Sequence, residues 1–261
     1  MNATPHIGIA MTTRNRSKTL GLALQHFAHY KRVYSARLWL VDDNSDSKHR
    51  LTNEALARQF GWNYLRLEDR HGVARAKNAA LAQVRDCENI MLFEDDAWPI
   101  ADNWDEYLLT CMQVNSCQAL NACHPNGMAD DHIVEVFGEK EYQLVNVANS
   151  TGYVMLWTRE ALAALGGYDT RMGICGGEDT QMNLRCFNAG FKPYPYCGPA
   201  LIGQHIYSVD LDWVWGKIKK RPPLGQLEPE GSALTGAEKA DGWGVGAKFV
   251  HDPAIYQEPL I

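Results

Sequence analysis

Residues 89–96 read NIMLFEDD, an apolar run that is followed at once by three carboxylates. A short uninterrupted apolar run of this kind is typical of a strand that is buried on both faces of a sheet. Three adjacent acids at the end of such a strand repel one another unless a cation or hydrogen-bond donors compensate their charge. We therefore expect a buried strand over 89–93 that brings Glu94, Asp95 and Asp96 to a site with such compensation.

Strand-like and helix-like segments alternate through the first half of the chain. They are, in chain order, a strand over 6–11, a helix that Ser17 caps and that continues to Phe27, a strand over 37–41, a helix over 51–60, a strand over 63–67 and a helix over 74–84. Strands that alternate with helices of about 10 to 15 residues predict βαβ units. The sequence therefore predicts an α/β fold, with a mostly parallel sheet flanked by helices.

The second half of the chain is less regular. Its expected elements are a helix over 104–112, two strands within 133–147 around a charged GEKE turn, and helices over 158–165 and 180–188. Residues 216–246 are rich in Gly, Pro, Lys and Glu and have little periodicity, which is typical of a long loop or lid. We expect one domain over 1–205 and a C-terminal lid or acceptor-side extension over 206–261.

Composition excludes several classes of protein. The chain has 261 residues, of which 46% are hydrophobic, enough for a sizeable core and too many for a disordered chain. Its net charge of -6 argues against binding nucleic acid or an anionic membrane over the whole surface. No apolar run approaches the roughly 20 residues that span a bilayer, and the start does not resemble a signal peptide. The seven cysteines form no CxxC pair, so we expect free thiols and a cytoplasmic protein.

Polar clusters follow three of the predicted strands. They are Thr12–Arg16, Asp42–Ser45 and Glu94–Asp96. Each alone could be a solvated loop, but ligands of open α/β sheets bind beyond the carboxyl ends of the strands. Mg²⁺ often takes one or two carboxylates while the phosphates of a substrate supply further oxygens. The acidic cluster therefore suits a metal bound together with a diphosphate better than a cage made by the protein alone.

In order and spacing, the motifs resemble those of GT-A glycosyltransferases, above all those of family 2. The matching pieces are TTRNR (12–16), VDDNS (41–45), GVARAKNAAL (72–81), FEDDAWP (93–99), GGYD (166–169) and GGEDTQMNLRCFNAGF (176–191). FEDDAWP also resembles inverting N-acetylglucosaminyltransferases with EDD in place of Asp-x-Asp. GGED before a helix with Arg185 is similar to the C-terminal motif of galactosyltransferases. The resemblance implies a GT-A, Rossmann-like fold and a nucleotide-sugar donor.

The resemblance also implies which residues bind the donor. They are Thr12, Arg14 and Arg16 in the nucleotide pocket, Asp42 or Asp43 at the uracil and ribose, Arg75, Lys77 and Asn78 at the ribose or diphosphate, and Glu94 and Asp95 at the ribose, the sugar or a metal-bound water. Glu94 departs from the usual Asp-x-Asp pattern of the family.

Two residues are implied as metal ligands. Asp96 is the last acid of the Asp-x-Asp equivalent, and His205 lies about 26 residues past GGED, where many GT-A enzymes place a third ligand. Neutral imidazole with carboxylate and phosphate oxygens suits Mn²⁺ better than Mg²⁺. A lone histidine is more often structural, so both interpretations of His205 stay open.

The GGED segment carries the catalytic prediction. Gly176 and Gly177 let the backbone approach a sugar, and Glu178 and Asp179 begin a helix, whose N-terminus favours an ionised carboxylate. An inverting transferase needs one carboxylate to take the proton of the acceptor hydroxyl. We expect Asp179 to be this base and Glu178 to contact donor or acceptor hydroxyls. The alternative is a pair of acids that only caps the helix.

The sequence therefore predicts metal-dependent, inverting transfer of a sugar from a UDP-linked donor to an acceptor hydroxyl. One alternative is a sugar nucleotidyltransferase, although no GxGxR-type loop follows the first strand. Another is a non-catalytic nucleotide-sugar-binding protein, against which the EDD and GGED motifs argue together. The acceptor stays open among glycan, lipid, protein and a hydroxylated base of modified DNA. Trp98 and Tyr168 could stack on sugar rings, but a core or rim position is the favoured interpretation of each. Gly152 is expected on the acceptor side, and the basic residues Lys217, Lys219, Lys220 and Arg221 are expected to cover the diphosphate.

Overall fold

The computed structural model describes residues 6–123, 133–147, 152–170 and 177–209. The strands are β1 (Ile7–Thr13), β2 (Ala36–Asp42), β3 (Asn63–Arg66), β4 (Asn89–Glu94), β5 (Ala97–Pro99), β6 (Ala119–Asn121), β7 (Ile133–Phe137), β8 (Leu144–Val147), β9 (Val154–Thr158), β10 (Cys197–Pro199) and β11 (Ile206–Ser208). The helices are α1 (Ser17–His29), α2 (Ser47–Gln59), α3 (Val73–Ala82), α4 (Trp104–Val114), α5 (Arg159–Leu165) and α6 (Glu178–Asn188), with a short 3-10 helix over Ile202–Gln204.

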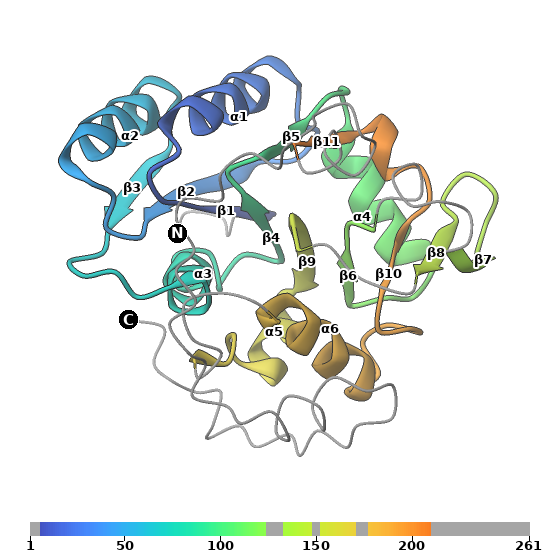
Figure 1. Cartoon of the computed structure of the whole chain (residues 1–261). Helices are drawn as coiled ribbons and strands as arrows, with labels where there is room; N and C mark the ends of the chain where they lie inside the picture. The colour runs from blue at the N-terminus through green and yellow to red at the C-terminus, as the bar shows by residue number, and fades with distance from the viewer. Residues whose placement is uncertain (1–5, 124–132, 148–151, 171–176, 210–261) are drawn as a thin grey trace, which may run out of the picture.

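The central sheet has six strands in the order β3-β2-β1-β4-β9-β6. Strands β1 to β4 are mutually parallel where they pair, whereas β9 is antiparallel to both β4 and β6. The chain runs outward from β1 to β3 and returns through α3 to β4 on the other side of β1 (Figure 1). The carboxyl ends of β1 and β4 therefore form the topological switch point at which open α/β sheets bind ligands. The predicted α/β fold with a mostly parallel sheet is confirmed.

Helices cover both faces of this sheet (Figure 1). On one face, alternate side chains of β1, from Ile7 to Met11, share a core with α1 and with Trp104 of α4. On the other face, Ala10 shares a second core with residues of α3, α5 and α6. Successive side chains of a strand point to opposite faces of the sheet. A strand that is covered by helices on both faces is therefore apolar along most of its length.

Two helix starts differ from the sequence-based expectation. Ser17 is the first residue of α1, and its hydroxyl donates to Asn53 Oδ1 at 2.7 Å instead of capping the helix. Helix α2 starts at Ser47 and not at Leu51. The prediction missed its first turn because the residues of that turn are polar and show no apolar periodicity. Thr158 does cap α5, since its hydroxyl accepts a hydrogen bond from Ala161 N at 3.2 Å.

Two small sheets extend the domain beyond the central one. The expected strand pair within 133–147 is confirmed as the antiparallel β7 and β8, which β10 joins in the order β10-β8-β7. Strand β11 pairs with β5, and Val209 N then donates to Asp96 O at 2.9 Å. The predicted division at 205/206 falls just before β11, and it stays a prediction. The predicted lid over 216–246 lies outside the described residues. Among the residues that the structure describes, no helix is both long and apolar enough to cross a bilayer.

Replacement of Gly198 by alanine is expected to destabilise the fold. A Cβ at this position of β10 would lie 1.9 Å from the backbone oxygen of Asn121, which cannot move without breaking the packing of β6. Overpacking of this kind costs about 1–3 kcal/mol in the free energy of unfolding, measurable by urea denaturation. Gly21→Ala in α1 is the matched control. Its Cβ would lie 3.7 Å from Leu56, so stability should hold or rise, and equal losses in both variants would contradict the assignment.

Candidate active site

The three polar strand ends meet at one edge of the sheet. Thr13 Oγ1, at the end of β1, donates to Asp95 Oδ2 after β4 at 2.6 Å. Asn15 N, after β1, donates to Ser45 Oγ after β2 at 2.9 Å. The expectation that the clusters following these strands lie together is therefore confirmed.

Arg16 supplies the positive charge that the acidic cluster needs. Its Nη1 lies 2.9 Å from Asp95 Oδ1 and its Nη2 lies 2.9 Å from Asp96 Oδ2. Burial of Arg16 would lower its pKa, but the two carboxylates outweigh burial and hold the pKa above its ordinary value. Burial raises the pKa of Asp95 to about 6, although Arg16 and Thr13 oppose this rise. Arg16 thus binds the acids directly, which the sequence did not reveal.

The chemistry of this cluster fits a divalent cation that is shared with a substrate. Glu94, Asp95 and Asp96 together carry more negative charge than Arg16 can neutralise, and their oxygens are hard ligands. Across the described ranges, no group of three or more His, Cys, Asp and Glu side chains could hold a metal. The metal–diphosphate site with Asp96 as a ligand stays a prediction.

His205 lies in a different setting from the acids. Its imidazole stacks on the ring of Tyr107 in α4, with ring centroids 3.9 Å apart and planes within 6°. Burial lowers the pKa of His205, which keeps the ring neutral at neutral pH. Neutral imidazole is the form that binds metals, but the stacking is what a structural histidine shows. The metal role of His205 stays a prediction, and this arrangement gives it no support.

The two aspartates at the carboxyl end of β2 are bonded to groups of the protein. Asp42 is fully buried, and its carboxylate accepts hydrogen bonds from Ser45 N, Asn53 Nδ2 and Tyr64 Oη. Because protein donors surround its oxygens, this arrangement gives a contact of Asp42 with the nucleotide no support, and the choice between Asp42 and Asp43 stays a prediction. Asp43 accepts hydrogen bonds from the backbone N–H groups of residues 71 and 72 and anchors the start of α3. Burial raises the pKa of Asp43, while these bonds and nearby Arg14 oppose the rise.

A second group of acids lies at the start of α6, and a lysine from α3 joins it to the first group. Lys77 Nζ lies 2.7 Å from both carboxylate oxygens of Asp179 and 3.5 Å from Glu178 Oε1. The same ammonium lies 3.3 Å from Glu94 Oε1 at the end of β4. The EDD and GGED motifs, far apart in sequence, are therefore connected through one buried cation.

The start of α3 turns two of its three predicted site residues inward. Lys77 is 1% exposed and its ammonium contacts carboxylates, so the structure gives its predicted contact with a donor no support. Asn78 is also turned inward, because its Nδ2 donates to Tyr168 O at 2.9 Å and its Oδ1 accepts from Tyr168 N at 2.6 Å. These bonds hold the GGYD segment against α3. Arg75 lies on the exposed side of the helix, where contact with a donor stays a prediction.

Asp179 is the more accessible of the two acids of the GGED motif. Its side chain is 15% exposed, compared with 9% for Glu178. Burial raises the pKa of Asp179 to about 7, while the charge of Lys77 opposes the rise. A Cβ at Gly152 would lie 1.8 Å from Asp179 Oδ2, so only glycine leaves room for this carboxylate. The arrangement suits a base that works near neutral pH.

Tyr168 has a role that the sequence did not reveal. It is 2% exposed, which agrees with a core residue and not with a sugar platform, and Lys77 Nζ lies 5.3 Å from the centre of its ring. The ring thus covers the ammonium with the negative face of its π system. Trp98 is 6% exposed and packs on Tyr207, which also argues against a sugar platform.

The other predicted site residues fall in three places. Thr12 lies in β1 between Val41 and Glu94 of the neighbouring strands, half-buried. Gly177 precedes α6 with φ 88°, a left-handed conformation that favours glycine. Gly176 lies outside the described residues, as do the basic residues 217–221.

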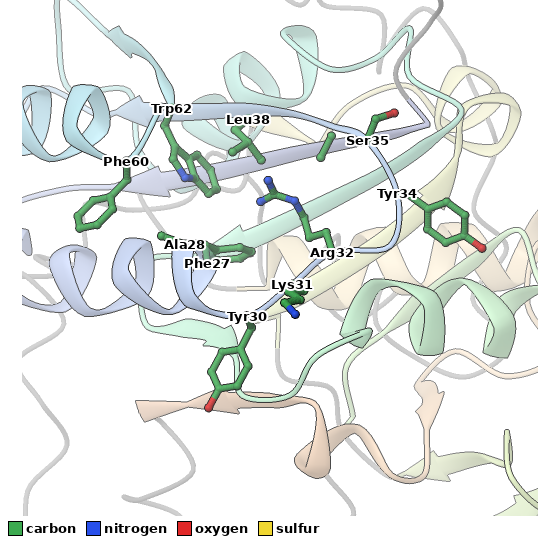
Figure 2. A pocket seen from close by; sticks show the side chains of 11 residues that line it. Phe27, Ala28, Tyr30, Lys31, Arg32, Tyr34, Ser35, Leu38, Phe60 and Trp62 are labelled. Atoms are coloured by element: carbon green, nitrogen blue, oxygen red, sulfur yellow. The ribbon is translucent and has the colours of Figure 1, made fainter.

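A cavity of about 300 Å³ lies away from the acids. It opens between the end of α1 and the start of β2, so it faces the amino ends of the parallel strands (Figure 2). Arg32 points into it beside Trp62, and Phe27 and Leu38 form its walls (Figure 2). The cavity lies at the opposite end of the parallel strands from the carboxyl end of β4, so it is separate from the candidate active site.

Comparison with known proteins agrees with the predicted family. Residues 8–127 match the model of the family described as Glycosyl transferase family 2. No curated protein matches the chain by sequence. The fold is similar to that of the mannosyltransferase PcManGT from Pyrobaculum calidifontis, solved with GDP-Man and Mn²⁺. The TM-score is 0.56 at 17% identity, over 73% of this chain and 54% of that one.

Two further solved structures share the fold. GalNAc-T7 with UDP, GalNAc and Mn²⁺ gives a TM-score of 0.54 at 15% identity, over 77% of this chain and 42% of that one. TarS from S. aureus gives 0.57 at 14% identity, over 90% of this chain and 41% of that one. The chain thus spans between 41% and 54% of the length of these three proteins. At such identities the similarity shows the GT-A fold.

Proposed function

We propose that this chain, which carries a glycosyltransferase family 2 domain over residues 8–127 of a GT-A fold, transfers a sugar from a nucleotide-sugar to an acceptor hydroxyl with inversion. One observation carries the proposal. Two sets of carboxylates, Glu94–Asp96 and Glu178–Asp179, face the same edge of the sheet and are joined by Lys77. The first set suits the diphosphate side of the reaction, and the second suits the acceptor side.

The acids after β4 serve the donor. Asp96, held by Arg16, is the proposed ligand of a divalent cation, Mn²⁺ or Mg²⁺, which when bound neutralises charge on the diphosphate. Arg16 also fixes Asp95, so both carboxylates keep one orientation before the donor arrives. Preorganised charges of this kind lower the barrier because they need not reorient during the reaction. GalNAc-T7 was solved with UDP and PcManGT with GDP-Man, and we propose UDP as the nucleotide here.

Asp179 acts on the acceptor. The acceptor oxygen forms a bond to the anomeric carbon while the bond from that carbon to the diphosphate oxygen breaks. The hydroxyl proton passes to the Asp179 carboxylate, and the electron pair of the broken bond leaves with the nucleoside diphosphate. Attack from the side opposite the leaving group inverts the configuration. Glu178, less exposed and close to Lys77, is placed to hold a hydroxyl beside the base.

A screen of nucleotide-sugars tests this function. UDP-sugars and GDP-mannose would be added with and without Mn²⁺, and the melting temperature and release of nucleoside diphosphate would be measured. The true donor should stabilise the fold by about 2.7 kcal/mol at a hundred times its Kd, and only with the metal. NMR of the product should then show inverted configuration at the anomeric carbon. Binding without any turnover would favour the non-catalytic alternative. A product with retained configuration would contradict the role of Asp179 as the general base.

A further inference from the structure

Lys77 is enclosed by groups from several separate parts of the chain. Its ammonium contacts Glu94 from β4 and both acids at the start of α6, and the ring of Tyr168 lies over it. Only 1% of the lysine side chain is exposed, and its ammonium is directed at these carboxylates and not at solvent. Burial of an isolated ammonium costs far more than burial of a paired one, so these acids are a condition for its position.

The shortest contacts of Lys77 are with the proposed base. Both oxygens of Asp179 lie 2.7 Å from Nζ, whereas Glu94 and Glu178 lie at 3.3 Å and 3.5 Å. Gly152 also packs against this carboxylate, since a Cβ there would overlap Oδ2. The carboxylate of Asp179 therefore contacts both a cation and a glycine, which restrict its rotation.

We propose, on the basis of the function proposed above, that Lys77 is a positioning residue that holds the Asp179 carboxylate in one orientation and favours its ionised form. It acts through Asp179 and touches no substrate. The same ammonium also lies 3.3 Å from Glu94 Oε1 at the end of β4, where it compensates a second negative charge.

The charges around Asp179 explain why this lysine matters. Glu94 from β4 and Glu178 from its own helix face it as like charges, and the phenol of Tyr168 is neutral. Both carboxylates and burial favour the protonated form of Asp179, which cannot act as a base. Among the described residues that face it, Lys77 supplies the opposing positive charge. Without that charge, the pKa of Asp179 should rise well above 7.

Replacement of Lys77 by methionine, with Lys77→Arg as the charge-conserving control, tests this role. The acid limb of the pH profile of kcat should move to higher pH by at least one unit in Lys77→Met, so kcat at pH 7 should fall about tenfold or more. KM for the donor should change little. Lys77→Arg should restore the position of the limb. An unshifted limb in Lys77→Met would overturn the proposal.

A second measurement separates this role from the proposed function. The pKa of the Asp179 carboxyl can be followed by ¹³C NMR, with Asp179→Asn to assign the signal, whether or not the chain transfers sugar. It should rise in Lys77→Met and stay near the wild-type value in Lys77→Arg, and an equal value in all three proteins would refute the role of Lys77. If the methionine variant does not fold, Lys77→Gln provides the same comparison.

The double variant completes the test. In the Asp179→Asn background, Lys77→Met should lower transfer no further, because a residue that acts only through Asp179 has nothing left to act on. Additive losses would show that Lys77 acts on another group. If the wild type shows no transfer with any donor, the proposed function fails, while the NMR result still decides the effect of Lys77 on Asp179.

Discussion

Asp179→Asn is expected to lower the rate of sugar transfer by about 10²- to 10⁴-fold while donor affinity changes little, because general base catalysis contributes a factor of this order. Asparagine keeps the shape of the side chain but cannot accept the proton of the acceptor hydroxyl. The effect should fall on kcat, measured by release of nucleoside diphosphate with a saturating donor. Calorimetry with the same donor should give nearly the wild-type Kd.

Glu178→Gln is the matched control for this variant. Glu178 shares the first turn of α6 and the neighbourhood of Lys77, but its side chain is less exposed. Its loss should act partly on substrate affinity and leave most of kcat in place. A transfer rate near the wild-type value in Asp179→Asn, or a larger loss of kcat in Glu178→Gln, would show that Asp179 is not the base. The pH profile of the wild type should rise through about pH 7, where Asp179 loses its proton.

Asp96→Ala is expected to abolish the metal dependence of nucleotide binding. The carboxylate is the proposed protein ligand of the cation, and a divalent ion at a leaving diphosphate supplies several kcal/mol of stabilisation. Transfer should therefore fall by about 10²-fold or more. Calorimetry with UDP, with and without Mn²⁺, should show the same weak affinity in both conditions.

Two further variants show whether the effect belongs to the metal. Asp96→Asn keeps an oxygen that can accept the hydrogen bond of Arg16, so its fold should be less disturbed than that of Asp96→Ala. Asp86→Ala removes an acid of the same type whose side chain is 61% exposed and paired with Arg37, and it should leave nucleotide binding unchanged. If Mn²⁺ still strengthens UDP binding in Asp96→Ala, the metal lies elsewhere.

The order of elements and the edge of the sheet that carries the site follow from local patterns. Short, mostly apolar runs such as 89–93 and 37–41 are typical of strands within a sheet, and the polar residues after them mark their carboxyl ends. Parallel strands place those ends together, so the meeting of Thr13, Ser45 and Asp95 could be predicted without a structure. The predictions of helix starts were less accurate, as for α2, because a polar first turn shows no apolar periodicity.

The partners of the charged side chains could not be predicted in this way. Lys77 lies four residues after Val73 and three before Ala80, and therefore on the apolar face of α3. In the sequence, this spacing is the feature that indicates that Lys77 is buried. Its partner Asp179 lies 102 residues away, and Asn78 pairs with Tyr168 across 90 residues. A motif shows which residue types lie near a strand end or a helix start, and so it predicts the chemistry of the site. Which oxygen faces which ammonium depends on how α3 and α6 pack against the sheet, because burial forces each charge onto whatever opposite charge the packing brings within reach.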